Sequence, residues 1–244
     1  FELEPYSIAI DATLTFVAGF ASDGFALREF SPGGGFAIGY LRDRLPPSVG
    51  SYAEVIASAV KQRCADLGLG LPTLVVEPGR AIVGRAGVAL YTVGAMKEIP
   101  AVRKYVSLDG GMGDNIRPAL YDARYDAVVA NRMSDAAVET VTLAGKFCES
   151  GDILVRDIGL PPISSGDLVA IPSSGAYAPA MASNYNLLPR PAVVMVLLPL
   201  SSPVRPRREP RSWSVTGQGY RCLPGDQRRS GPNDQGLPRP LRRP

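Results

Sequence analysis

The chain has 244 residues, of which 45% are hydrophobic and 20% charged, and its formal net charge at pH 7 is +3. This composition predicts a folded protein with a buried core, and no stretch reaches the roughly 18 consecutive apolar residues of a membrane helix. Histidine is absent, which excludes Ser-His-Asp chemistry, and Cys64, Cys148 and Cys222 lack the spacing of a zinc site. We expect a cytoplasmic protein with reduced thiols, no bound metal and no membrane contact.

The amino-terminal elements are predicted to alternate between helix and strand. In chain order they are a helix that starts at residue 2 and ends before Ser22, a strand at 25–30, a helix at 50–67 and a strand at 74–76. Gly68 and Gly70 end the second helix, and the second strand is expected to be buried on both faces. This rhythm predicts part of a (β/α) barrel over residues 1–85, with its ligand site at the carboxyl ends of the strands.

From about residue 86, short β-rich segments with frequent turns replace this rhythm. The predicted strands are 88–95, 104–108, 127–130, 140–143, 153–155, 168–171 and 193–196. Strands of this length and spacing predict an antiparallel β-barrel or sandwich, which gives a second domain over residues 86–196.

The composition changes again in the last segment. Residues 1–196 hold 16 basic and 20 acidic side chains, whereas residues 197–244 hold 10 arginines, three acidic residues and nine prolines. Such a segment predicts a disordered tail, and its abrupt start suggests out-of-frame translation. An arginine-rich arm for nucleic acid is the alternative, but the rest of the chain is mildly acidic, so we expect no nucleic-acid partner.

Two loops that follow predicted strands carry residues suited to bind an anion. Gly33, Gly34 and Gly35 would let main-chain N–H groups converge on a phosphate, although the triplet alone is more typical of an ordinary turn. Glu77-Pro78-Gly79-Arg80 adds an arginine that can hold phosphate or carboxylate and a glutamate that would keep a pyridine nitrogen protonated. This tetrapeptide alone would indicate only a surface Glu/Arg pair.

Three further motifs follow the two loops in a fixed order. They are Asp114-Asn115-Ile116-Arg117-Pro118-Ala119-Leu120-Tyr121, Cys148-Glu149-Ser150-Gly151-Asp152 and Gly175-Ala176-Tyr177. Together with the loops, they resemble the diaminopimelate decarboxylases, which belong to the fold type III pyridoxal-phosphate enzymes along with ornithine and arginine decarboxylases. The resemblance covers residues 1 to about 196.

The resemblance implies pyridoxal 5'-phosphate as the cofactor and assigns residues to it and to the substrate. The implied cofactor contacts are Gly33, Gly34, Gly35, Glu77, Pro78, Gly79, Arg80 and Tyr177. The implied substrate contacts are Arg80, Arg117, Tyr121, Glu149 and Tyr177. The resemblance implies that Arg117 and Tyr121 bind the distal carboxylate of the substrate and that Glu149 binds its distal ammonium. Cys148 corresponds to the family's proton donor, whose loop reaches into the partner subunit's site and so implies a homodimer with shared active sites.

The chain departs from the family at both ends. In the family, the Schiff-base lysine and the histidine stacked on the cofactor lie earlier in the barrel. This chain has four lysines, and none of them lies in a segment that matches the family's lysine motif: Lys61, Lys97, Lys104 and Lys146. Because the Schiff-base lysine is absent, we expect the chain to be inactive alone. Because Phe1 is not an initiator methionine, we expect that the chain starts inside a longer reading frame. The tail replaces the elements that would close the second domain, which predicts exposed apolar surface and poor solubility.

The leading functional prediction is a lyase fragment whose complete protein converts meso-2,6-diaminopimelate to L-lysine in lysine biosynthesis. Two alternatives stay open at this point. One is a related decarboxylase that acts on ornithine or arginine. The other is a non-catalytic regulator of the same fold that dimerises with an active relative.

Overall fold

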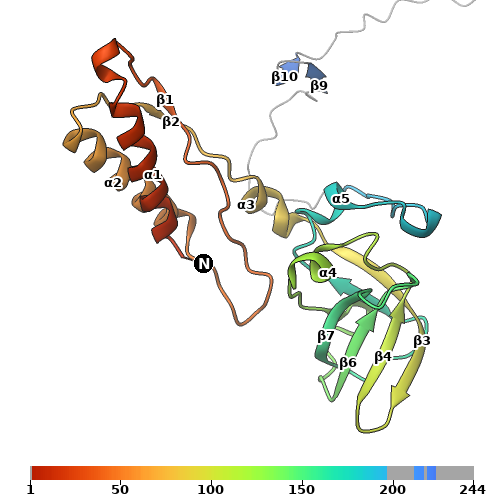
Figure 1. The fold of residues 1–244 in the computed structure, drawn as a ribbon. Helices are drawn as coiled ribbons and strands as arrows, with labels where there is room; N and C mark the ends of the chain where they lie inside the picture. The colour runs from red at the N-terminus through yellow and green to blue at the C-terminus, as the bar shows by residue number, and fades with distance from the viewer. Residues whose placement is uncertain (1, 197–211, 217–218, 224–244) are drawn as a thin grey trace, which may run out of the picture. The chain divides into compact units, whose positions relative to one another are not determined.

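The computed structural model describes residues 2–196, 212–216 and 219–223 (Figure 1). The chain divides into two units, Phe1–Val193 and Val194–Pro244. Within the described residues, no helix is both long enough and apolar enough to cross a membrane.

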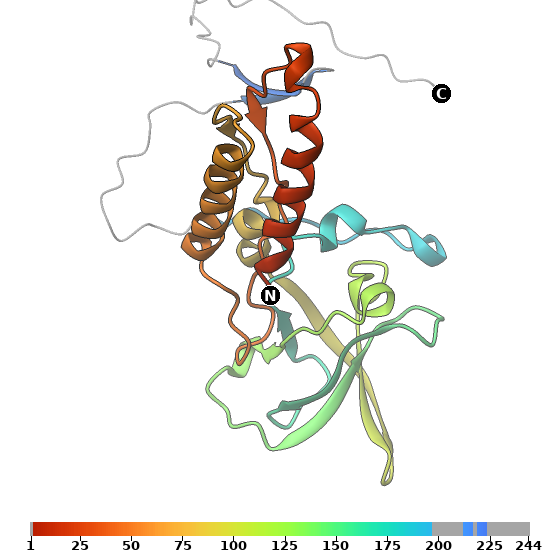
Figure 2. The same cartoon turned by 60° about the vertical axis from the view of Figure 1, so that its left-hand side comes forward.

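Two helices lie side by side at the start of the first unit (Figures 1 and 2). The elements here are α1 (Glu4–Ala18), the 3-10 turn η1 (Ala21–Asp23) and α2 (Val49–Asp66). Both predicted helices are confirmed, although the first ends at Ala18, a few residues earlier than the predicted end before Ser22. The Ser48 hydroxyl accepts a hydrogen bond from the Ser51 N–H at 3.0 Å and so caps α2. Gly68, with φ +65°, ends α2 as predicted.

The two helices share a hydrophobic core that is separate from the core of the sheet. Its buried members are Ile10, Leu14, Phe30, Phe36, Tyr52, Ile56, Val60 and Cys64. Those on α2 recur every four residues, so they form one stripe that faces α1. A second core fills the inside of the β-rich part. The domain boundary near residue 85 stays a prediction.

A short parallel pair of strands connects the helices. β1 (Glu29–Phe30) pairs with β2 (Thr73–Leu74), so the predicted strands are found but are only two residues long. The prediction that residues 74–76 are buried on both faces is wrong, because Leu74, Val75 and Val76 are 38–40% exposed. A sheet of two strands has no further layer to cover these side chains. The prediction that residues 1–85 form part of a (β/α) barrel stays a prediction.

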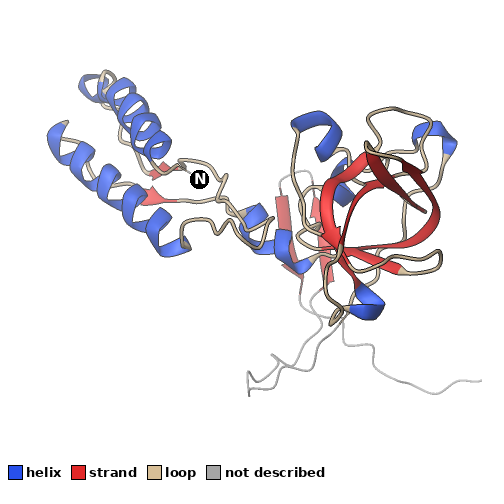
Figure 3. Ribbon diagram, turned by 90° about the horizontal axis from the view of Figure 1, so that it is seen from below, coloured by secondary structure: helices blue, strands red, loops and turns tan. Residues whose placement is uncertain are grey.

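The β-rich part is a six-stranded sheet that curls on itself (Figure 3). After α3 (Gly79–Val83) and the turn η2 (Gly84–Ala86), its strands are β3 (Ala89–Ile99), β4 (Arg103–Leu108), β5 (Val128–Val129), β6 (Glu139–Ala144), β7 (Ile153–Leu160) and β8 (Leu168–Ile171). The strand order is β5-β8-β3-β4-β6-β7.

The prediction of an antiparallel sheet holds for every pairing in this sheet except one. β4 and β6 run parallel, with Val106 opposite Leu143. A parallel pair needs a long crossover connection, and here it contains α4 (Arg117–Tyr121), β5 and the turn η3 (Ala130–Arg132). The sheet is therefore mixed, and the crossover carries the Arg117 motif.

The end of the first unit and the tail differ from prediction. After α5 (Ala178–Met181) and η4 (Tyr185–Leu187), residues 193–196 form no strand. Their side chains are 73–87% exposed, and no strand in the described part of the chain pairs with them. In the tail, β9 (Ser212–Thr216) and β10 (Gly219–Leu223) form an antiparallel pair where disorder was predicted. Aromatic and β-branched residues alternate with polar ones in these strands, a pattern that favours β-structure. The other residues of 197–244 lie outside the described part.

Candidate functional site

The glycine loop and the Glu77 segment lie against each other. They follow β1 and β2 at the carboxyl ends of two parallel strands, where ligands bind in such sheets. Gly34 pairs with Glu77 in an isolated parallel bridge, and the Glu77 N–H donates to the Gly33 carbonyl at 3.0 Å. The Ser31 hydroxyl donates to Glu77 Oε1 at 2.9 Å. The structure therefore brings these predicted cofactor residues together.

Only glycine fits the loop as it is folded. Gly33 and Gly35 have φ values of +82° and +87°, in the left-handed region that side chains disfavour. A Cβ at Gly34 would collide with the Glu77 carbonyl oxygen. The Gly34 carbonyl is in turn held by the Tyr6 hydroxyl, which donates to it at 2.5 Å. A backbone built this way suits the close approach of a phosphate.

Arg80 is placed by α3 beside the same loop. Its Nη2 donates to the Gly35 carbonyl at 3.2 Å. Its Nε is buried and has no hydrogen-bond partner among the described residues. A buried donor without an acceptor is costly, so an acceptor atom from a ligand or a water would stabilise this side chain. The donor set at this loop fits an anion such as the phosphate of pyridoxal phosphate.

Arg117 is buried, with 9% of its surface exposed, at the start of α4. Its Nη1 donates to the Tyr125 hydroxyl at 2.6 Å, and its guanidinium carbon lies 4.8 Å from the centre of the Tyr40 ring. None of the ion pairs in the described part of the chain involves Arg117. A buried guanidinium with no carboxylate partner is poised to receive an anion. Tyr121, four residues on, is 60% exposed.

Cys148 and Glu149 project from a loop that Asp152 anchors. The Asp152 carboxylate accepts hydrogen bonds from the N–H groups of Met112 and Phe147 at 2.6 and 2.7 Å. Burial raises the pKa of Asp152, although the two donors favour its charged form. Cys148 is a free, exposed thiol, and Glu149 Oε1 accepts from the Gly151 N–H at 3.3 Å.

Tyr177 follows a backbone segment that packs on the end of α3. The Gly175 N–H donates to the Gly84 carbonyl at 3.0 Å, and the Ser174 N–H donates to the Gly87 carbonyl at 2.9 Å. Tyr177 itself is 44% exposed, and the preceding peptide bond is cis. The Tyr177 segment is therefore joined by hydrogen bonds to the residues that follow Arg80.

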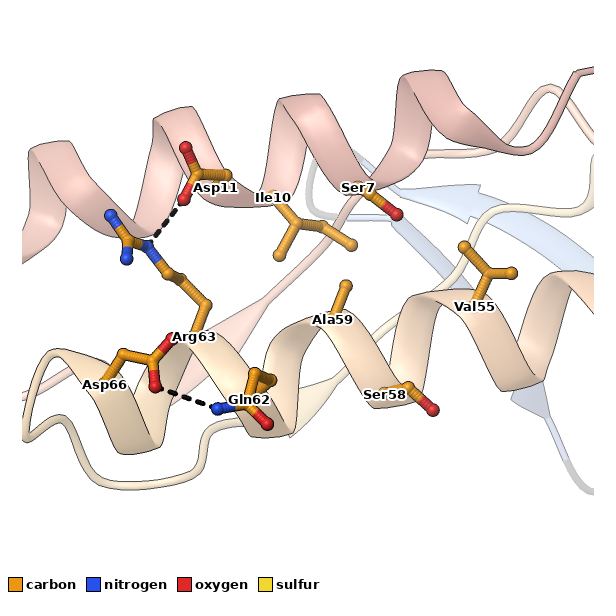
Figure 4. A pocket seen from close by; sticks show the side chains of 9 residues that line it. All are labelled: Ser7, Ile10, Asp11, Val55, Ser58, Ala59, Gln62, Arg63 and Asp66. Atoms are coloured by element: carbon orange, nitrogen blue, oxygen red, sulfur yellow. Dashed lines mark hydrogen bonds and ion pairs between the residues drawn. The ribbon is translucent and has the colours of Figure 1, made fainter.

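The predicted residues fall into two groups. Bonds join the glycine loop, Glu77 and Arg80 directly, and the Tyr177 segment attaches to them through residues 84 and 87. No interaction found among the described residues links Cys148, Glu149 or Tyr121 to this group. A groove of about 530 Å³ between α1 and α2 contains none of the predicted residues (Figure 4). It is lined by Ser7, Ile10, Asp11, Val55, Ser58, Ala59, Gln62, Arg63 and Asp66.

Three residues of the site were missed in the sequence: Tyr40, Tyr125 and Asp152. Tyr125 lies eight residues after Arg117, but Tyr40 lies 77 residues before it, and no local pattern connects such distant positions. Asp152 was quoted within a motif but given no role. Asp152 follows Cys148 by four residues, a spacing at which an aspartate side chain often closes a tight loop. This spacing was the signal that could have predicted its role.

Comparisons with known proteins agree with the motifs. Residues 11–175 match the family described as "Pyridoxal-dependent decarboxylase, C-terminal sheet domain". The diaminopimelate decarboxylase of Bacillus subtilis (strain 168) is 52% identical over 172 residues, which cover 70% of this chain and 39% of that protein.

Solved structures that match this chain belong to the same group of decarboxylases. Diaminopimelate decarboxylase of M. jannaschii, in complex with L-lysine, matches with a TM-score of 0.71 and 30% identity over 91% of this chain and 46% of that one. A lysine/ornithine decarboxylase from Vibrio vulnificus matches with a TM-score of 0.65 and 25% identity, over 78% of this chain and 49% of that one. The chain spans less than half the length of each of these relatives. The resemblance carried by the motifs is confirmed, and the chain belongs to the pyridoxal-dependent decarboxylases.

Proposed function

We propose that this chain is the carboxyl-terminal part of a pyridoxal-phosphate-dependent carboxy-lyase that converts meso-2,6-diaminopimelate to L-lysine. The observation that carries the proposal is Arg117, a buried guanidinium without a carboxylate partner in the described residues. Diaminopimelate brings a second carboxylate that would satisfy this charge, whereas ornithine and arginine do not. The complete protein is expected in the cytoplasm, in keeping with the free thiols of Cys64 and Cys148.

The residues present fit the cofactor. Pyridoxal phosphate, when bound, takes up the electron pair that remains after carbon dioxide leaves. Gly33, Gly34, Gly35, Pro78, Gly79 and Arg80 would hold its phosphate, with the orphaned Arg80 Nε as one donor. The Glu77 carboxylate would lie at the pyridine nitrogen, and Tyr177 would contact the cofactor from the adjoining segment.

The remaining residues would bind substrate and move a proton. Arg117 and Tyr121 would hold the distal carboxylate, Glu149 would hold the distal ammonium, and Arg80 and Tyr177 would complete the contacts. Cys148 would donate the proton that replaces the lost carboxylate. Because Cys148 and Glu149 are exposed and apart from the glycine loop within this chain, we infer a homodimer in which they serve the partner's site.

The experiment uses a joined enzyme, in which the part of the Bacillus subtilis relative that precedes the matched region is fused to Phe1 of this chain. Carbon dioxide release is measured with meso-diaminopimelate, L-ornithine and L-arginine. We expect activity on diaminopimelate, with KM raised about 100-fold by Arg117→Gln. Preference for ornithine would favour the alternative suggested by the Vibrio vulnificus structure and would refute the proposal.

The dimer is tested by mixing two inactive variants of the joined enzyme. Cys148→Ser and Arg80→Gln remove residues that the proposal assigns to opposite subunits of one site. The mixture should then recover up to about a quarter of the parent activity, since half of the dimers are mixed and each mixed dimer has one of its two sites intact. No recovery, although co-purification of two differently tagged variants shows that mixed dimers form, would mean that each site is built from one chain.

A further inference from the structure

The Arg117 guanidinium is framed by two tyrosine rings from different parts of the chain. Its carbon lies 4.8 Å from the Tyr40 ring centre and 5.8 Å from the Tyr125 ring centre. The two rings meet edge to face, with centroids 5.2 Å apart and an interplanar angle of 82°. Tyr125 is 3% exposed, so the pair excludes water from the cation on these sides.

The two tyrosines restrain different degrees of freedom of the arginine. The Tyr125 hydroxyl accepts a hydrogen bond from Nη1 at 2.6 Å, which fixes the direction of one donor. The guanidinium carbon lies over the Tyr40 ring, and this cation–π contact restrains the position of the cation. Nε and Nη2 remain as a pair of parallel donors, the arrangement that binds a carboxylate in a bidentate manner.

Tyr40 also links this arginine to the other parts of the site. Its hydroxyl donates to the Ala176 carbonyl at 3.4 Å, next to Tyr177. The Ser173 hydroxyl donates to the Gly39 carbonyl at 2.9 Å, which holds the backbone on the other side of Tyr40. The glycine loop ends five residues earlier, at Gly35. Tyr40 therefore joins Arg117 to the Tyr177 segment.

We propose that Tyr40 and Tyr125 are positioning residues that fix the position of the Arg117 guanidinium and so determine the preference for a substrate with a second carboxylate. This inference rests on the proposed function of Arg117. Neither tyrosine needs to contact the substrate. Their effect passes through the geometry of the two donors that remain on Arg117.

Kinetics of the joined enzyme test this role. We expect Tyr125→Phe and Tyr40→Leu to raise KM for diaminopimelate about tenfold with kcat within about twofold, because uniform binding is lost. Tyr40→Phe keeps the ring and should bring KM back to within about twofold of the parent. The matched control is Tyr105→Leu, which removes the ring 6.0 Å from the Arg103 guanidinium on β4 and should leave KM unchanged.

A second measurement does not depend on turnover. In joined enzyme labelled with ¹⁵N-arginine, the Arg117 Nε–Hε signal is identified by its absence in Arg117→Lys. Its hydrogen exchange should be at least tenfold faster in Tyr125→Phe and Tyr40→Leu than in the parent and in Tyr40→Phe.

The two measurements separate the two hypotheses. Parent enzyme that is inert towards diaminopimelate refutes the proposed function, while the exchange rates still decide whether the tyrosines hold Arg117. Exchange within twofold of the parent in both variants overturns the positioning role, whatever the activity. Loss of kcat with unchanged KM also overturns it, because the tyrosines would then act on the chemical step.

Discussion

At the scale of single residues, the nitrogen atoms of the Arg80 side chain differ in their surroundings. One of its nitrogen atoms donates to the Gly35 carbonyl, and another is buried without an acceptor in the described residues. The planar, forked arrangement of donors matters here more than the charge alone.

We therefore predict that Arg80→Lys in the joined enzyme weakens pyridoxal phosphate binding roughly 10- to 100-fold, the value of one or two charged hydrogen bonds. Cofactor absorbance during titration measures this affinity. Arg85→Lys, at an exposed arginine in the adjacent turn, is the matched control and should bind normally. Equal affinities for both variants would remove Arg80 from the cofactor site.

The exposed thiol of Cys148 leads to a second residue-scale prediction. Cys148→Ser should lower kcat about 10²- to 10³-fold with little change in KM, because a hydroxyl is a much weaker acid than a thiol. Ser150→Ala, two residues away in the same loop, controls for disturbance of the loop. If kcat falls by the same factor in both variants, the effect comes from the structure of the loop and not from proton transfer.

At the scale of elements, Asp152 joins the loop that follows β4 to the loop that follows β6. Its carboxylate binds the N–H groups of Met112 and Phe147, and Gly111 and Gly145 pack so closely on it that a Cβ at either would collide. Asp152→Asn should lower the free energy of unfolding by about 2–3 kcal/mol, because the amide presents an N–H where an acceptor is needed.

Thermal unfolding of the joined enzyme measures this effect. Asp114→Asn is the control, since its carboxylate accepts one N–H, from Gly111, at 2.9 Å. It should cost about 1 kcal/mol. An Asp152 variant no less stable than the Asp114 variant would contradict the anchoring role.

A second link between elements depends on pH. Asp167 accepts hydrogen bonds from Arg132 at 2.6 Å, from Asn131 and from the Ser164 N–H, and these lower its pKa to about 2. Because this folded pKa lies below the ordinary value of 3.8, the link is at full strength above about pH 4. Its contribution is lost as the pH falls towards 2.

In Asp167→Asn, stability should therefore decrease less between pH 4 and pH 2 than it does in the parent. The unfolding midpoint, measured at each pH, gives this decrease. Asp135→Asn removes the exposed partner of the same Arg132 and should leave that decrease unchanged. If the unfolding midpoint depends on pH equally in the parent and in Asp167→Asn, the Asp167 link does not contribute to acid unfolding.

The elements also show what periodicity can and cannot predict. Periodicity predicted α1, α2 and the bounds of β8 correctly, because the spacing of apolar residues within one element follows from the face that this element buries. It failed for residues 193–196, whose apolar run found no partner strand. It also missed the parallel β4–β6 pairing, since the register between distant strands is set by the crossover that joins them.

For the candidate site, motifs predicted the residues whose type is dictated by chemistry, such as Glu77, Arg80 and Arg117. The glycine loop, Glu77 and Arg80 do meet in the structure. The tyrosines that hold Arg117 could not be predicted, because a ring against a cation leaves no fixed spacing in the sequence.

At the scale of the whole molecule, apolar surface remains uncovered near the parallel strands. Leu74, Val75 and Val76 are 38–40% exposed beside a sheet of two strands. We predict that the chain expressed alone aggregates and binds a hydrophobic dye, whereas the joined enzyme binds several-fold less dye per chain. Light scattering and dye fluorescence measure both. A monodisperse chain that melts cooperatively without the added part would contradict this prediction.

The strand order also affects how the chain is made. Thr92 on β3 pairs with Leu168 on β8, so one edge of β3 has no partner until synthesis has passed residue 168. At about 5–20 residues per second, this delay on the ribosome is roughly 4 to 15 seconds. During that time the nascent chain presents an open strand edge, and chaperones that bind emerging β-strands would act most strongly in this interval.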